Sequence, residues 1–266
     1  MQLRVGRIAY TNVAPIETAF DNGSIERAAS VLRAAPTTLN AALSAGELDV
    51  SPISAAHYLA HRSDFALFGD FGIVSRGPAM SVLLVSSRPP TLLDGASIAV
   101  TRDSASGRAL LESVLVGRYG VQASFETVDD ATAAARAGRP SLLIGDAAIA
   151  IRDEMPVTDI YDLGAAWLEW TSLPMVFAAW AVRRDVLAKR PEDVADLANR
   201  YVQARDWGVL NRVAVVSAAM TEQPRKAAFY DQYFSTLTYT IDADARAGLA
   251  RFATAIGFPE DSRVAR

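Results

Sequence analysis

The chain has 266 residues, 51% of them hydrophobic, which is enough for two small lobes or one large α/β domain. A net charge of −4 without any Lys/Arg block argues against nucleic acid as a partner. The absence of Cys excludes disulfides, iron–sulfur clusters and thiol nucleophiles. No segment has the roughly 18 apolar residues of a membrane span, and the first residues do not resemble a signal peptide. We therefore expect a cytoplasmic protein with no membrane partner.

Short strands and helices alternate over the first 74 residues. The patterns predict strands at 3–10, 28–33, 48–53 and 65–74, and helices that begin at Pro15 and span 36–45 and 54–60. Gly69 and Gly72 predict that the last of these strands is irregular or bulged. The alternation favours a mainly parallel sheet with helices on its faces.

Two apolar runs, Ala79–Ser87 and Met175–Val182, each follow a Pro closely and are typical of strands buried on both faces. Between them we predict strands at 97–100, 123–127 and 141–144, helices at 106–118, 130–137 and 146–151, and a Trp-rich loop. Beyond Arg184 we predict only helices, at 191–206, 208–220 and 242–255.

The two apolar runs are predicted to carry the chain from one lobe to a second and back. Lobe 1 would comprise 1–83 and 179–266, and lobe 2 would comprise 84–178. The expected fold is a two-lobed α/β structure with mixed, mainly parallel sheets and a ligand cleft between the lobes.

Small and polar residues follow the predicted strands, where ligands bind in open α/β sheets. They are Thr11-Asn12, 51–54, Ser81, 103–107 and Gly145-Asp146. Helix starts with small residues leave N–H groups available for an anion, so a small carboxylated ligand is expected. Helix capping is the alternative for Asn12, Ser104, Ser106 and Asp146. A buried hydroxyl that needs only a protein partner is the alternative for Ser81.

Other patterns indicate no further chemistry. His57 and His61 are four residues apart, but Tyr58 stands where a zinc protease needs Glu, so a boundary helix is favoured over a metal site. Trp167, Trp170 and Trp180 are expected in the core. Nucleotide-binding glycine motifs are absent. The residues alone leave a transport receptor and an enzyme both open.

Six stretches together carry a resemblance that spans the chain. They are VGRIAYTNVAPI (5–16), GELDVSPIS (46–54), GPAMSVLLVS (77–86), LLIGDAAI (142–149), DLGAAWLEWTSLPMVFAAWAVRRD (162–185) and YFSTLTY (233–239). In these the chain resembles the chorismate dehydratases of the futalosine menaquinone pathway, the MqnA family. The resemblance implies a type II periplasmic-binding-protein fold.

The implied reaction removes water from chorismate to give 3-[(1-carboxyvinyl)oxy]benzoate. Because the product is aromatic, no cofactor or metal is expected. The related 1,4-dihydroxy-6-naphthoate synthase carries His-Glu where this chain has Gly145-Asp146, and the missing His favours the dehydratase. A non-catalytic solute-binding protein for a small carboxylate is the alternative from another class.

The resemblance assigns Asn12 the catalytic role of orienting the enolpyruvyl group or the leaving hydroxyl. Carboxylates would be held by Ser81, Ser104, Ser106 and the N–H of Gly107, with Ser54 as a further candidate. Gly145 and Asp146 would line the lobe 2 wall, and Asp146 would face the C4 hydroxyl. The family commonly has Thr-Ser where Ser106-Gly107 stands, so one hydroxyl is lost here. With no obvious general base, the substrate's own enolpyruvyl carboxylate is predicted to take the C3 proton.

Overall fold

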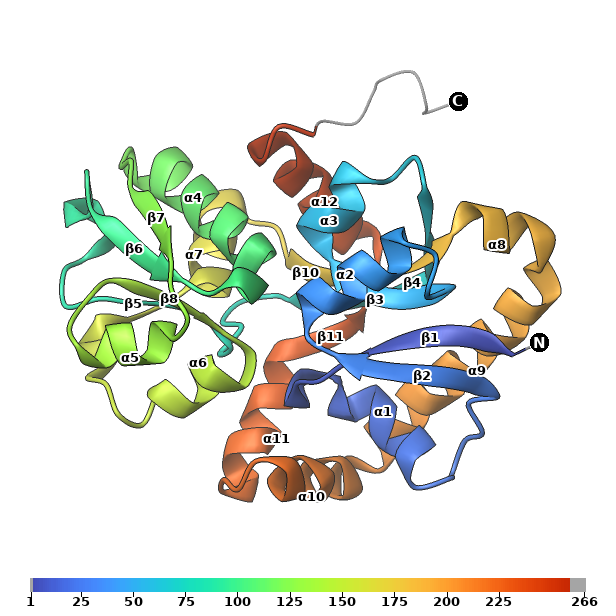
Figure 1. The fold of residues 1–266 in the computed structure, drawn as a ribbon. Helices are drawn as coiled ribbons and strands as arrows, with labels where there is room; N and C mark the ends of the chain where they lie inside the picture. Colours follow the sequence, from blue (N-terminus) through green and yellow to red (C-terminus); the bar gives the residue numbers. More distant parts are fainter. Residues whose placement is uncertain (1, 259–266) are drawn as a thin grey trace. The chain divides into compact units, whose positions relative to one another are not determined.

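The computed structural model describes residues 2–258, which form two compact units. Unit 1 contains the chain up to Ile73 together with Ala178–Thr240, and unit 2 contains Val74–Phe177 together with the chain from Ile241 onward. Each unit has helices around its own mixed sheet (Figure 1), so the predicted two-lobed α/β fold is confirmed. Among the described residues, no helix is both long enough and apolar enough to span a bilayer.

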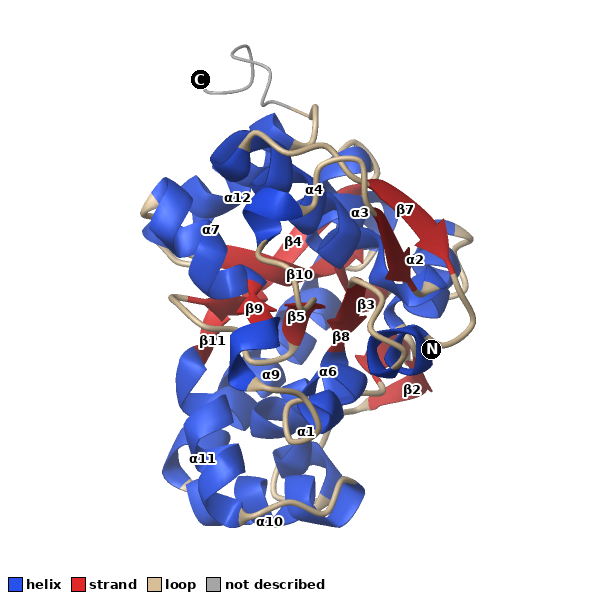
Figure 2. Ribbon diagram, turned by 90° about the vertical axis from the view of Figure 1, so that its left-hand side faces the viewer, coloured by secondary structure: helices blue, strands red, loops and turns tan. Residues whose placement is uncertain are grey.

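Unit 1 begins with alternating strands and helices, as predicted, and ends mostly in helices. Its elements are β1 (Leu3–Ile8), η1 (Thr11–Val13), α1 (Ala14–Asp21), β2 (Ala29–Ala34), α2 (Pro36–Ser44), β3 (Val50–Ser54), α3 (Ala55–Ala60), β4 (Phe65–Ser75), β10 (Met175–Arg183), α8 (Arg184–Lys189), α9 (Pro191–Leu210), α10 (Arg212–Glu222), α11 (Ala227–Thr236) and β11 (Leu237–Thr240). Helix α10 lies against both α1 and α11 (Figure 2).

The sheet of unit 1 has the strand order β11-β4-β10-β3-β1-β2. Strand β1 runs parallel to both β2 and β3, whereas β10 is antiparallel to β3. Strand β10 is buried along nearly its whole length, which confirms the strand predicted from the apolar run after Pro174. The paired residues of β10 and β3 start at Ala178, where the chain re-enters unit 1.

Unit 2 repeats the alternation on a smaller scale. Its elements are β5 (Val82–Val85), η2 (Pro90–Leu92), β6 (Ser97–Val100), η3 (Arg102–Ser104), α4 (Ala105–Tyr119), β7 (Ser124–Thr127), α5 (Ala131–Arg136), β8 (Ser141–Ile144), α6 (Gly145–Ile151), η4 (Val157–Asp159), β9 (Ile160–Asp162), α7 (Leu163–Thr171) and α12 (Ala243–Ala255). The strand order is β7-β6-β8-β5-β9, with β6 parallel to β7 and β8, and β5 antiparallel to β8 and β9.

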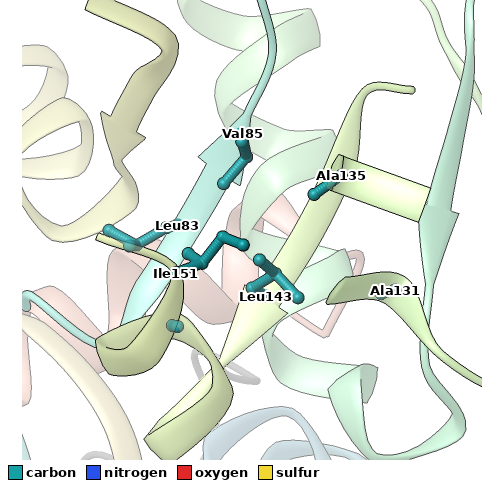
Figure 3. Close-up of a cluster of buried hydrophobic side chains, with 7 residues drawn as sticks. Leu83, Val85, Ala131, Ala135, Leu143 and Ile151 are labelled. Carbon is teal, nitrogen blue, oxygen red and sulfur yellow. The ribbon is translucent and has the colours of Figure 1, made fainter. Parts of the chain in front are cut away.

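Alternate residues of the central strands of unit 2 pack against different helices. Leu83, Val85 and Leu143 form a buried cluster with side chains of α5 and α6, including Ala135 and Ile151 (Figure 3). Because side chains alternate across a pleated strand, the residues between them face the other side, where α7 lies against β5 and α4 lies against β8. The sheet is thus buried on both faces, which explains why β5 has no polar position.

The crossing between units differs from the sequence prediction at its first strand. Strand β5 pairs only with strands of unit 2, and the chain leaves unit 1 earlier, between Ile73 and Val74 in β4. An apolar run predicts burial, but it cannot specify which sheet buries the strand. Strand β4 is continuous over its eleven residues, with the expected irregularity confined to Gly69, whose φ is +60°.

Two segments have a different secondary structure from the one predicted. The Trp-rich stretch forms β9 and α7 instead of a loop, and Asp162 accepts hydrogen bonds from the first N–H groups of α7. The region beyond Arg184 is not purely helical, because α11 leads directly into β11. The alternation of buried and half-buried residues in Leu237–Thr240 is typical of an edge strand.

Helix α12 belongs to unit 2, whereas the sequence placed the whole C-terminal region in lobe 1. Phe252 packs edge-on against Trp167 with ring centroids 5.8 Å apart. A Cβ on Gly248 would lie 2.0 Å from the Pro174 carbonyl oxygen, so only glycine permits this close approach. Asp242 caps α12 and pairs with Arg76 of the same unit.

Candidate functional site: the carboxyl edges of the two sheets

Asn12 lies just beyond the carboxyl end of β1, in the short 3₁₀ turn η1. Its side-chain oxygen Oδ1 is buried and has no hydrogen-bond partner among the described residues. The capping alternative does not hold, because Tyr10 and Val13 occupy the N-cap positions of η1 and α1. A buried amide oxygen without a partner is costly, so it marks a position where a ligand or an ordered water is expected.

The backbone of Asn12 is tied to a distant strand of the same unit. The Tyr239 hydroxyl of β11 donates to the Asn12 carbonyl oxygen at 2.6 Å. Burial raises the pKa of Tyr239 well above its usual value, with Tyr233 as a second cause, so the hydroxyl remains a donor. The neighbouring Thr238 has a buried hydroxyl without a hydrogen-bond partner among the described residues.

Ser54 ends β3, whose carboxyl end lies at the same edge of the sheet as that of β1. Its hydroxyl accepts from the His57 N–H, as the N-cap of α3, and from Asn40 Nδ2, both at 3.3 Å. The Ser54 N–H donates to Asn40 Oδ1 at 3.1 Å. These bonds give Ser54 a structural role at the helix start, and a ligand would compete with them.

The predicted residues of unit 2 meet at one edge of its sheet. Strands β6 and β8 end there, and the antiparallel β5 begins there. The Gly145 N–H donates to the Ser81 carbonyl oxygen at 2.8 Å, which joins the start of β5 to the end of β8. The Ser81 side chain is buried and donates to the Ala79 carbonyl oxygen at 3.3 Å. Asp146 is half-buried in the first turn of α6, where Ile144 holds the N-cap position.

The start of α4 lies beside these residues. Ser104 is the N-cap residue by position, but its hydroxyl pairs with Thr101 Oγ1 at 2.8 Å and makes no capping bond. Ser106 is buried in the first turn of α4. A Cβ on Gly107 would lie 3.1 Å from the side chain of Ile144, so this glycine lets α4 pack closely on β8.

Asp162 holds the segment before Ser81 in place, a role that no local sequence pattern indicates. Its carboxylate accepts from the N–H groups of Ala79 and Met80, at 2.8 and 2.7 Å, and from two N–H groups of α7. Met80 has φ +61°, a left-handed conformation that is unfavourable for a side-chain-bearing residue. We infer that the Asp162 carboxylate fixes this conformation and thereby the position of Ser81.

The two histidines at α3 lie side by side. The rings of His57 and His61 lie 4.2 Å apart, and His57 Nε2 is 2.9 Å from the Ser44 hydroxyl. Burial lowers the pKa of His57 to about 4, and the nearby His61 adds to the effect. Both histidines are half-buried, as expected for a boundary helix. The described residues contain no group of three or more His, Cys, Asp and Glu side chains arranged to hold a metal.

Comparison with solved structures identifies the class of fold. The chain is similar to protein AF1704 from Archaeoglobus fulgidus, with a TM-score of 0.74, 20% identity, and coverage of 96% of this chain and 97% of that one. It is similar to the Candida albicans CA3427 product, described as having the generic periplasmic binding protein fold (TM-score 0.71, 13% identity, coverage 98% and 92%). It is also similar to the periplasmic aliphatic sulphonate binding protein SsuA from Escherichia coli (TM-score 0.67, 17% identity, coverage 96% and 91%).

The protein therefore has the fold of the periplasmic binding proteins, as predicted. A family described as menaquinone biosynthesis matches residues 3–257, and the chain belongs to this family. It is 31% identical over 271 residues to the chorismate dehydratase of Thermus thermophilus, covering 96% of this chain and 95% of that protein.

Two residues that sequence reasoning missed stand out at these edges. Tyr239 lies in a segment whose alternation, LTYT, is a usable strand signal. Asp162 precedes a helical stretch at a spacing typical of an N-cap, so its bonds to α7 were predictable. Its bonds to Ala79 and Met80 join residues more than 80 positions apart and have no local sequence signal.

Proposed function

We propose that the protein is a chorismate dehydratase, a hydro-lyase of menaquinone biosynthesis. The observation that carries the proposal is the near full-length similarity to the Thermus thermophilus chorismate dehydratase, together with membership of the menaquinone biosynthesis family. The buried, unpartnered Oδ1 of Asn12 supports a ligand at the edge where the sequence predicts one.

The proposed reaction starts at C3 of chorismate. The C3–H bond breaks and its proton passes to the substrate's enolpyruvyl carboxylate, while the electron pair spreads toward the ring carboxylate. The C4–O bond then breaks, hydroxide leaves, and the ring becomes aromatic. The proton and the hydroxide together account for the lost water. The protein's part is to orient the reacting groups and to stabilise developing charge, which in other enzymes supplies most of the rate enhancement.

Asn12 is the proposed catalytic residue in this scheme, and it would orient the enolpyruvyl group or the leaving hydroxyl. In unit 2, hydroxyls of Ser81, Ser104 and Ser106 would bind carboxylates, with Gly107 contributing its N–H. Gly145 and Asp146 would form the wall beside them. That a single substrate contacts both sets of residues stays a prediction.

The backbone at Gly145 argues against the related naphthoate synthase. Gly145 has φ +58°, which favours glycine, and its N–H is bound to the Ser81 carbonyl. A His at this position, as in the synthase, would be strained in this backbone. The position therefore suits a reaction that needs no histidine base there.

The test is to incubate the purified full chain with chorismate, without added cofactor, and to measure the enolpyruvyl-benzoate product by chromatography. We expect turnover by the wild-type protein. Binding of chorismate without any product would support the solute-binding alternative and overturn the proposal.

Asn12→Ala tests the catalytic residue. Loss of one oriented polar group typically costs about 2.7–4 kcal/mol, or on the order of a hundredfold or more in kcat. Asn22→Ala is the matched control, because Asn22 lies at the other end of α1 and its Oδ1 accepts from the nearby Ser24 N–H in an exposed turn. Wild-type kcat in Asn12→Ala would remove Asn12 from the mechanism.

A cytoplasmic location remains a prediction, which fractionation of native cells would test.

A further inference from the structure

The Asn12 carbonyl lacks the hydrogen-bond donor that a 3₁₀ turn normally supplies. In a 3₁₀ turn, the carbonyl of residue 12 would accept from the N–H of residue 15. That residue is Pro15, which has no N–H, although Pro is well suited to the first turn of α1. Pro15, which starts the helix, therefore removes the i+3 donor for the carbonyl of the proposed catalytic residue.

Tyr239 supplies the missing donor from the opposite end of the chain. Its hydroxyl lies 2.6 Å from the Asn12 carbonyl oxygen, although 227 positions separate the two residues. The Tyr239 side chain is buried, and it sits on β11, which is hydrogen-bonded to β4 in the unit 1 sheet. A buried ring on a paired strand is a more rigid anchor than a loop side chain.

The helix starts on either side of Asn12 have no side-chain caps. Neither N-cap residue, Tyr10 for η1 or Val13 for α1, makes a side-chain capping bond. The Asn12 side-chain oxygen has no partner among the described residues that would fix its direction. The direction of the Asn12 side-chain amide therefore depends on the position of the Asn12 backbone. A displacement of a catalytic group by about 1 Å can lower the rate on the order of a hundredfold.

We propose that Tyr239 is a positioning residue for the dehydration, and that its hydroxyl holds the Asn12 backbone so that the Asn12 amide meets the substrate. The proposal rests on the proposed function. Tyr239 itself contacts no reacting atom in this scheme and acts only through Asn12.

Tyr239→Phe is the direct test, because it removes the hydroxyl and keeps the buried ring. We expect kcat for chorismate to fall about tenfold, which is the loss of a typical hydrogen bond expressed as a rate, while KM changes little. Tyr230→Phe is the matched control. Tyr230 is also buried, and its hydroxyl donates to the Gln223 carbonyl at 2.8 Å, so this variant should lose a comparable bond without losing kcat.

The double variant Asn12→Ala with Tyr239→Phe separates positioning from direct action. If Tyr239 acts through Asn12, the double variant has the kcat of Asn12→Ala alone. Multiplied losses, or a wild-type kcat in Tyr239→Phe, would overturn the proposal. A Tyr230→Phe variant that loses kcat equally would do the same, since the effect would then be merely structural.

Hydrogen exchange gives a readout that does not depend on activity. Tyr239→Phe should speed amide exchange in the peptide that contains Thr11–Val13, and Tyr230→Phe should leave this peptide unchanged. Faster exchange in a protein that fails to dehydrate chorismate would mean that the proposed function is wrong and the anchoring is right. Unchanged exchange would refute the anchoring whatever the activity.

Discussion

Asp162 offers the sharpest test of how unit 2 holds its strand edge. The perturbation is Asp162→Ala, which removes a carboxylate that accepts four backbone N–H groups at 2.7–3.2 Å. Two of these donors belong to the first turn of α7, and two belong to Ala79 and Met80 before β5. The variant therefore removes a helix cap and a link between distant segments at once.

The expected cost follows from these two roles. Loss of an N-cap costs about 1 kcal/mol, and leaving a buried N–H unpaired costs about 1–3 kcal/mol. Ala79 and Met80 are only 1% and 4% exposed, so water cannot readily replace the carboxylate. Burial raises the pKa of Asp162 because the carboxylate is removed from water, and Asp162→Ala also removes this unfavourable contribution to stability. We therefore expect a net loss of about 3 kcal/mol in the free energy of unfolding.

Two further variants grade the effect. Asp162→Asn can keep its amide oxygen at the position of Oδ1, which accepts three of the four N–H groups, so only the Met80 N–H would face the amide nitrogen. We therefore expect this variant to lose about half as much stability as Asp162→Ala. Asp130→Ala is the matched control, since Asp130 caps α5 in the same unit with bonds to Thr132 and Ala133, both in the helix that it caps. It should lose only about 1 kcal/mol.

The assay is urea unfolding of the full chain, followed by tryptophan fluorescence and by circular dichroism. Trp167 is fully buried in unit 2 and reports on its unfolding. If Asp162→Ala costs no more than Asp130→Ala, the link to Ala79 and Met80 contributes nothing and the reasoning is refuted.

Three other predictions concern unit 1. Because the pKa of His57 is lowered to about 4, only the unfolded chain binds this proton between about pH 6.5 and pH 4, and the wild-type protein should lose about 1–2 kcal/mol of stability as the pH falls through this range, a value discounted because the ring is half-exposed. His57→Gln should abolish this loss, and a variant whose urea midpoint depends on pH as steeply as that of the wild type would contradict the prediction. Gly208→Ala should cost more than about 2 kcal/mol despite the better helix propensity of Ala, because its Cβ would lie 1.8 Å from the Pro15 carbonyl oxygen; wild-type thermal stability would disprove this. Glu17→Gln should cost about 3–5 kcal/mol, since Glu17 is buried and pairs with Arg27, and a loss below 1 kcal/mol in urea unfolding would count against it.

Local patterns in the sequence determined most of the elements and the class of fold. Alternation and turn residues predicted the strands and helices of the first 74 residues, and the apolar run at Met175–Val182 predicted the buried strand β10. These signals are local, because a strand or helix must match its own side-chain period to the layer that buries it. The edge positions of Asn12 and Gly145 followed from the ends of β1 and β8, whereas Ser81 lies at the start of β5 and was predicted inside a strand.

Only the tertiary structure decided which segments meet. Strand β5 joins the sheet of unit 2, α12 packs on unit 2 through Phe252, and Tyr239 reaches the Asn12 carbonyl. Burial of an apolar run is satisfied by any complementary layer, and a hydrogen bond between residues 12 and 239 leaves no periodic trace in either segment. Partner choice is set by packing and by which buried polar groups find each other, and these are properties of the folded chain rather than of any local stretch.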